Sequence, residues 1–291
     1  METHESFRAM DTDIDVFIET PDAAPPASFI GARLLFEQQE ERFSRFRPQS
    51  MLCRLNDGEV IDHPWFARAV SMAIDAFELT GGMFNPMVLP ALQQAGYSGT
   101  FAEVATGGVL ESQRVPDPKK VLRINGLAVE LLAGQMDLGG IVKGWTADLA
   151  VEQLAEAHGN AFVNAGGDIR SVGSDGKEDL GWAMDVALPG DTGPAWAGRL
   201  RGGIATSTIL KRRWTTADGG EAHHLIDPGT GMPSESPFVQ VTARADACWL
   251  AEVWAKAVLI GGHETLERAR RADVPVLAFD AAGTKTAAGK W

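Results

Sequence analysis

Residues 137–144 read DLGGIVKG, so an aspartate and a lysine flank two glycines just before a predicted helix. Glycines allow the backbone to approach a ligand closely. A helix N-terminus offers unpaired N–H groups to an anion, and Lys143 adds a mobile cation suited to phosphate. The segment therefore predicts either an anion site or an ordinary turn.

A second segment, residues 164–170 with the sequence NAGGDIR, follows a predicted strand. It combines an amide, two glycines and an acid. One interpretation is a tight turn in which Asp168 bonds its own backbone. The other is a site towards which Asn164 points, and both stay open at this stage.

Two adjacent histidines, His223 and His224, precede the turn sequence DPGTG of residues 227–231. Histidine changes charge near neutral pH and can act as a general base. Arg212 and Arg213 lie a short way before them in the chain. This third segment therefore predicts either a general base or ordinary packed or surface histidines.

The composition limits the kinds of ligand and partner. With 291 residues, 45% hydrophobic and 22% charged, the chain is composed like a globular protein. Its net charge of −13 repels nucleic-acid backbones, so no nucleic-acid partner is expected. A phosphorylated ligand would need local cations, amide groups or a metal. Cys53 and Cys248 form no disulfide framework and no metal-ligand spacing.

The sequence shows no signal segment and no apolar run of about 18 residues. We therefore expect no membrane span and a cytoplasmic location.

The elements that must position these residues mix helices and strands without strict alternation, which favours α+β over a doubly wound sheet. A glycine- and polar-rich stretch at 99–118 can divide two halves. Asp246 is expected to cap a late helix that Gly261 and Gly262 end. The other predicted helices are 30–43, 66–77 and 143–158, and the predicted strands are 12–19, 161–163, 182–188 and 274–279.

Seven segments in order resemble the FAD:protein FMN transferase family (ApbE-like, formerly described as thiamine-biosynthesis lipoproteins). They are residues 44–56, 82–86, 137–144, 163–170, 205–207, 224–231 and 251–261. The resemblance implies one α+β domain over residues 1–291. It also implies two related α/β subdomains with mixed sheets and an FAD cleft between them.

The same resemblance implies site residues and a reaction. It assigns flavin contacts to Met10, Phe46, Met83, Phe84, Asn85, Asp137, Lys143 and Ile226. His224 takes the position of the catalytic base. A threonine or serine hydroxyl of an acceptor protein would attack the FMN-side phosphorus of FAD and release AMP. With water as the attacking group, the site would be an FAD pyrophosphatase, and a non-catalytic FAD-binding paralogue is the third alternative.

The resemblance further implies Mg²⁺, held by a carbonyl near Gly140 and by an aspartate and a threonine four residues apart on the late helix. This chain has Glu252 and Lys256 at those two positions, and Asn85 where the family usually has an aspartate. An ammonium cannot ligate Mg²⁺, which takes oxygen ligands. Residues i and i+4 share a helix face. Either the two form a surface pair, or Lys256 contacts FAD in place of the metal, anchored by Glu252.

Overall fold

An eight-stranded antiparallel sheet is the frame of the computed structural model, which describes residues 1–22, 25–99, 104, 108–177, 181–191, 193–217 and 219–291. The strand order is β1-β2-β6-β7-β10-β15-β16-β17. All seven ladders of this sheet are antiparallel, which corrects the expectation of mixed sheets. The strands are β1 (Glu2–Ala9), β2 (Thr12–Glu19), β6 (Ala161–Ala165), β7 (Asp168–Val172), β10 (Gly202–Thr208), β15 (Phe238–Ala245), β16 (Val276–Asp280) and β17 (Lys285–Ala288).

The alternating pattern of β2 shows why this segment is a strand. Ile14, Val16 and Ile18 are each completely buried, while the residues between them point to the other face. Side chains alternate across a strand, so this pattern gives one apolar face to pack under helices. β1 pairs with it through the tight turn at Met10 and Asp11, both with positive φ.

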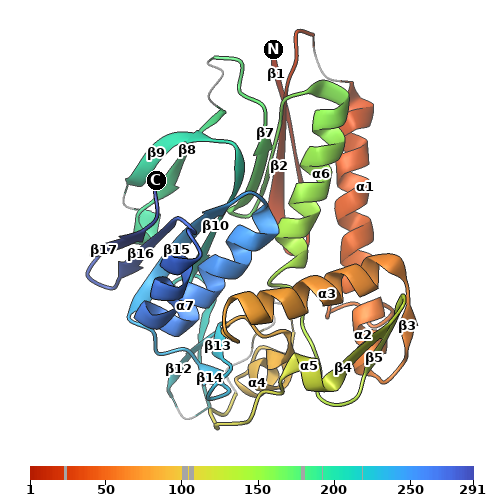
Figure 1. Ribbon diagram of the computed structural model, residues 1–291, viewed down its shortest axis with the longest axis vertical. Coiled ribbons are helices and arrows are strands. Elements are labelled where there is room, and N and C mark those ends of the chain that lie inside the picture. The colour runs from red at the N-terminus through yellow and green to blue at the C-terminus, as the bar shows by residue number, and fades with distance from the viewer. Residues whose placement is uncertain (23–24, 100–103, 105–107, 178–180, 192, 218) are drawn as a thin grey trace.

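Three long helices cover the sheet in Figure 1: α1 (Pro26–Phe43), α6 (Val142–His158) and α7 (Cys248–Arg271). α1 and α6 share an apolar cluster with β1, β2 and β6, and α7 shares another with β15 and β16. The backbone of α7 leaves helical geometry at Gly262, with φ of 59° and ψ of −142°. The helix therefore kinks at the predicted glycine pair, but continues for another nine residues instead of ending there.

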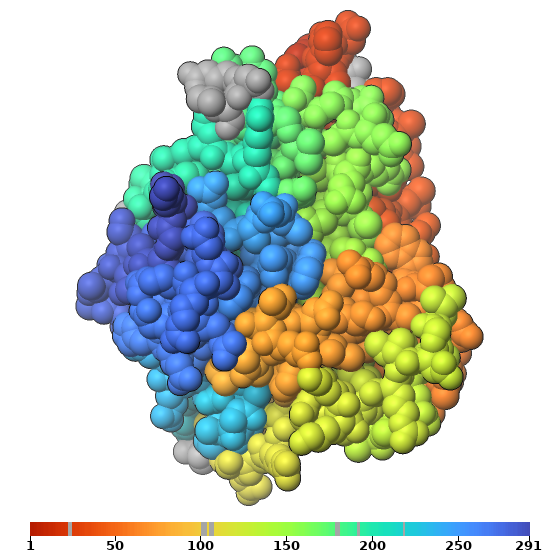
Figure 2. Space-filling model, in the orientation of Figure 1, coloured from red at the N-terminus to blue at the C-terminus, as the bar shows by residue number. Residues whose placement is uncertain are grey.

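A smaller helical region packs against the start of α6 and against Val253 of α7. Figure 2 shows the blue segment of α7, the green segment of α6 and the orange segment of α3 adjoining on one face. This region contains α2 (Met51–Asn56), α3 (Pro64–Leu79), η1 (Pro86–Val88), α4 (Leu89–Gln94) and α5 (Pro118–Val121), with a small sheet of β3 (Ile61–Asp62), β5 (Ala128–Leu131) and β4 (Leu122–Asn125).

Three two-stranded ribbons complete the described elements. They are β8 (Trp182–Ala187) with β9 (Pro194–Leu200), β11 (Arg213–Thr215) with β12 (Glu221–His223), and β13 (Ile226–Asp227) with β14 (Met232–Pro233). The short helix η3 (Pro189–Asp191) lies between β8 and β9.

The α+β class and the predicted helices are confirmed, but the cap of α7 is not the predicted one. The N-cap residue is Ala247, and no side chain of its own segment caps the helix. Asp148 of α6 accepts hydrogen bonds from the N–H groups of Cys248 at 2.7 Å and Trp249 at 3.0 Å. A carboxylate a hundred residues away in sequence thus takes the role expected of Asp246.

The division at 99–118 stays a prediction, because residues 100–103 and 105–107 lie outside the described residues. Within the part of the chain that the structure describes, no helix is long and apolar enough to cross a membrane.

Candidate functional site

A cleft of about 1020 Å³ is lined by both the sheet and the smaller helical region. All the residues predicted from the sequence to form the site lie on its wall, although they come from distant parts of the chain. They are Met10, Phe46, Met83, Phe84, Asn85, Asp137, Gly140, Lys143, His224, Ile226, Glu252 and Lys256. The structure therefore brings the whole predicted set together around one cavity.

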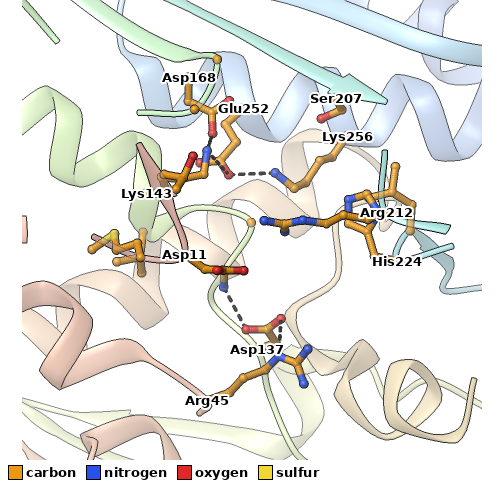
Figure 3. Close-up of a pocket in the computed structure, with 18 of the residues that line it drawn as sticks. Asp11, Arg45, Asp137, Lys143, Asp168, Ser207, Arg212, His224, Glu252 and Lys256 are labelled. Carbon is orange, nitrogen blue, oxygen red and sulfur yellow. Dashed lines mark hydrogen bonds and ion pairs between the residues drawn. The ribbon is translucent and has the colours of Figure 1, made fainter. Parts of the chain in front are cut away.

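Lys143, in the first turn of α6, is a fixed and paired cation (Figure 3). Its ammonium forms an ion pair with Asp168 of β7 and donates to the carbonyl of Ala165 at 3.2 Å. Burial lowers the pKa of Lys143 to about 8, although the nearby charge of Glu252 opposes that shift. The expectation of a mobile cation at this position was wrong, because two neighbouring groups hold it.

The turn before β7 explains why Asp168 is available to Lys143. The side chain of Asn164, and not that of Asp168, bonds the turn by accepting from Gly167 N–H at 2.8 Å. Gly166 has a φ of 63°, and a Cβ there would lie 2.0 Å from Thr12 Oγ1. Asp168 therefore does not bond its own turn. It is buried and forms an ion pair with Lys143 in the cleft.

Glu252 of α7 is completely buried at the bottom of the cleft. Its Oε2 accepts from Gly144 N–H at 3.0 Å, and its Oε1 accepts from Lys256 Nζ at 2.7 Å. Burial works to raise the pKa of Glu252, but the charges of Lys256 and Lys143 and these hydrogen bonds together hold it below the usual value. The surface-pair interpretation is wrong, because α7 is covered on the side that carries Glu252.

The same contact changes the expectation for the start of α6. A helix N-terminus attracts an anion, but the anion bound by Gly144 N–H is the protein's own carboxylate. A Cβ at Gly144 would lie 2.9 Å from Glu252 Oε2 and equally close to the Trp249 backbone. The glycine is therefore needed for the close approach of α6 and α7.

Lys256 lies beside Gly140, where the resemblance implies a magnesium-binding carbonyl. A Cβ placed on Gly140 would lie 3.3 Å from both Cδ and Cε of Lys256. Both carboxylate oxygens of Glu252 are occupied by N–H donors. These residues do not fit Mg²⁺, which requires several oxygen ligands.

His224 lies between β12 and β13, and its half-buried side chain lines the cleft. Burial holds the pKa of His224 well below 6.5, and the charges of Arg212 and Lys256 lower it further. Its Nδ1 is buried and has no hydrogen-bond partner in the described residues. An uncharged imidazole with a free nitrogen can accept a proton.

The neighbouring His223 has a different environment. Its Nε2 lies 3.0 Å from the carbonyl oxygen of Ser234, and its Nδ1 accepts from Leu225 N–H at 3.3 Å. Both ring nitrogens are engaged by the backbone, and His223 does not line the cleft. Of the two adjacent histidines, His224 is the one placed to meet a ligand.

Arg45 lies in residues 44–56, one of the segments that resemble the family, but the resemblance assigns it no role. Its guanidinium stacks over the rings of Phe46 at 4.2 Å and Tyr97 at 4.6 Å, and its Nε lies 3.9 Å from Asp137 Oδ2. Its Nη2 is buried without a hydrogen-bond partner in the described residues. Asp137 in turn accepts from Gly139 N–H at 2.9 Å. Arg45 therefore presents an unsatisfied donor next to the aromatic side chain predicted to contact flavin.

Arg45, Asp168 and Arg212 are among the residues of the cleft that were not predicted as site residues. Each belongs to a segment that stood out in the sequence. Asp168 pairs with Lys143, and Arg45 contacts Tyr97 and Asp137, across intervals that no local spacing encodes.

Figure 3 shows Lys143, Asp168, Glu252 and Lys256 gathered together, and Arg45 with Asp137 at a separate place in the cleft. Cations and an uncharged histidine accompany the first group, and Phe46 accompanies Arg45. The fold and cleft thus define an α+β protein suited to an extended anionic ligand with an aromatic group.

The chain belongs to the ApbE family, whose family model matches residues 10–278. It is 28% identical over 286 residues to the FAD:protein FMN transferase of Treponema pallidum, covering 86% of this chain and 76% of the relative. It is 26% identical over 257 residues to the Vibrio cholerae enzyme of the same name, covering 84% and 76%.

Solved structures of this family have the same fold. The ApbE protein of Thermotoga maritima superposes with a TM-score of 0.87 at 22% identity, covering 99% of this chain and 97% of the other. Flavin transferase ApbE from Vibrio cholerae gives a TM-score of 0.79 at 22% identity over the same shares. These similarities confirm the fold expected from the sequence.

Proposed function

We propose that this chain is an FAD:protein FMN transferase, which moves FMN from FAD to a threonine or serine hydroxyl of an acceptor protein. The observation that carries the proposal is the half-buried His224, whose pKa desolvation and nearby cations hold well below 6.5, on the wall of the same cleft as Lys256, Arg212 and the predicted flavin contacts. Family membership and the names of the relatives support it.

FAD fits the character of this cleft. Phe46 is 37% exposed and offers an aromatic face, while Met83 and Phe84 add apolar surface. The buried donor at Arg45 Nη2 and the free His224 Nδ1 lack partners in the described residues. Buried polar groups are normally hydrogen-bonded, so a polar ligand is the natural partner for both. We assign the aromatic end to the flavin ring and the cationic group to the diphosphate.

The chemical step is a substitution at the FMN-side phosphorus. The acceptor hydroxyl oxygen forms a new bond to that phosphorus as the bond to the bridging oxygen breaks. AMP leaves with the bridging oxygen, and FMN stays attached through a phosphoester. His224 removes the hydroxyl proton, and cations offset the charge that develops on the phosphate oxygens.

Magnesium has no part in this mechanism, because the residues beside Gly140 do not fit the ion. The chain's own cations remain to perform charge neutralisation. Lys143 and Lys256 are held by Asp168 and Glu252, and Arg212 lies near His224. Such fixed charges need little reorganisation during the reaction.

Incubation with FAD and a purified candidate acceptor protein tests the proposal. We expect mass spectrometry to show the acceptor heavier by one FMN in phosphoester linkage, with one AMP released per transfer. An acceptor in which the modified residue is replaced by alanine is the control. Free FMN plus AMP without labelling would identify an FAD pyrophosphatase, and unchanged bound FAD would identify a non-catalytic FAD-binding protein. The cytoplasmic location stays a prediction that cell fractionation tests.

A further inference from the structure

Lys256 lies where it can contact the diphosphate of a bound FAD, if the proposed function is correct. We infer that the Lys256 ammonium, held by Glu252, neutralises the diphosphate of FAD, so that FAD binding requires no divalent metal.

Lys256 is held in place before any ligand arrives. Glu252 lies one helical turn earlier and accepts from Lys256 Nζ at 2.7 Å. The other oxygen of Glu252 is fixed by Gly144 N–H of α6 at 3.0 Å. Because Glu252 is completely buried, its carboxylate cannot swing into water and release the lysine. The ammonium is thus pre-positioned, which reduces the entropy lost on binding.

The charges near Lys256 leave an excess of positive charge. Lys143 is paired directly with Asp168, and Glu252 offsets Lys256. Arg212, whose charge acts on His224, is the third cation. Among these five side chains, three cations and two carboxylates leave one positive charge, whereas the cations and carboxylates of the whole cleft lining balance. In a chain with a net charge of −13, such a local excess is what an incoming diphosphate needs.

The surroundings of Gly140 favour an ammonium over a metal. The Lys256 methylenes would lie 3.3 Å from a Cβ on Gly140, so this side chain occupies the space beside the loop. Glu252 has no unoccupied carboxylate oxygen to offer an ion. An ammonium has three N–H donors, of which Glu252 takes one, and the others can bind phosphate oxygens.

The test measures ligand affinity by flavin fluorescence and calorimetry, with EDTA and with Mg²⁺. The unmodified protein should bind FAD equally well in both buffers. Lys256→Met keeps the side-chain length but removes the charge, and should weaken FAD binding roughly ten- to hundred-fold, as for a lost charged hydrogen bond. Its affinity for riboflavin, which has no phosphate, should be unchanged. Lys256→Arg should recover most of the FAD affinity.

Lys120→Met is the matched control, because Lys120 of α5 also pairs with a nearby acid, the N-cap residue Asp117, but is 75% exposed and outside the cleft. It should change neither ligand's affinity. The double variant Glu252→Asp with Lys256→Thr should bind FAD weakly in EDTA and regain affinity with Mg²⁺.

Loss of FAD from the unmodified protein on chelation alone would overturn the inference, and this measurement needs no variant to fold. Equal weakening of riboflavin and FAD by Lys256→Met would also overturn it, since that would indicate a structural role. FAD binding only with Mg²⁺ would refute the lysine inference and leave the transferase proposal intact. No FAD binding in either buffer would refute the proposed function itself.

Discussion

The carboxylate of Asp148, in the middle of α6, accepts a hydrogen bond of 2.7 Å from the N–H of Cys248, the first residue of α7. A second bond from Trp249 N–H and an ion pair with Arg170 Nε at 3.2 Å complete its contacts. The two helices are therefore joined where α7 begins. Glu252 lies one turn further along α7, so this cap also fixes where Glu252 meets Gly144.

We expect Asp148→Ala to lower the free energy of unfolding by about 1–3 kcal/mol, because two N–H groups lose a buried acceptor. Asp148→Asn keeps one acceptor oxygen and should cost less. Urea unfolding followed by circular dichroism measures both. Asp246→Ala is the control: Asp246 is exposed, gives α7 no side-chain cap, and should leave the stability unchanged. A larger loss for Asp246→Ala than for Asp148→Ala would contradict this assignment.

The titration of Asp148 predicts a pH dependence of stability. Burial raises the pKa of Asp148 from 3.8 to about 6, against the lowering effect of its hydrogen bonds and of Arg170. Between these two values the folded protein binds more protons than the unfolded chain, so this group's contribution to stability falls as the pH rises through that window. Comparing Asp148→Asn with the unmodified protein from pH 4 to pH 7 isolates the effect. A stability difference that is independent of pH over this range would show that the carboxyl is not raised.

His224→Ala should slow FMN transfer by roughly 10²–10⁴-fold, the usual contribution of a general base. FAD affinity should change little, because a base acts mainly in the transition state. His223→Ala is the neighbouring control, since its ring is engaged by backbone groups outside the cleft. Single-turnover rates and FAD titrations of both variants separate the two effects. Transfer at the parent rate by His224→Ala would exclude this residue as the base.

The lowered pKa of His224 predicts how the transfer rate depends on pH on the acidic side. Burial and nearby cations hold the pKa of His224 well below 6.5, so the ring stays uncharged at neutral pH. The transfer rate should therefore begin to fall only when the pH drops well below 6.5. An acidic limb centred at or above that value would require a different base.

FAD affinity should fall as the pH rises through about 8. Burial lowers the pKa of Lys143 to about 8, and above that pH the ammonium loses the charge that attracts a diphosphate. Lys143→Arg, whose side chain stays charged, should bind FAD with little change over the same range. Riboflavin, measured in parallel, should show no such dependence. An unmodified protein whose FAD affinity is constant from pH 7 to pH 9 would refute this role for Lys143.

Phe46→Ala should weaken FAD and riboflavin to the same extent, by roughly three- to ten-fold, because both ligands carry the ring that stacks on an aromatic side chain. Lys256→Met, in contrast, should weaken the binding of FAD but not of riboflavin. Ile124→Ala is the control, because Ile124 on β4 is 38% exposed, similar to Phe46, and lies outside the cleft. Unchanged riboflavin affinity in Phe46→Ala would place the flavin ring elsewhere.

The sequence by itself determined the family, the α+β class and most of the long elements. These features depend on local patterns: the alternation of Ile14, Val16 and Ile18 predicts a strand, and the apolar spacing after Lys143 predicts α6. β1 was missed, because its alternating polar residues at the sheet edge give no apolar stripe. Every site residue that the ordered motifs predicted lies on the wall of the cleft.

Only the tertiary structure decided which side chains are paired and which are free. The pattern of α7 placed Glu252 opposite its apolar stripe, but α6 covers that side, so the carboxylate is buried and bonded to Gly144. Lys143 meets Asp168, and Asp148 meets Cys248, across intervals that no local spacing encodes. The reason is physical: charge pairing, desolvation and the pKa of His224 depend on distances in space, which are set when helices pack on the sheet.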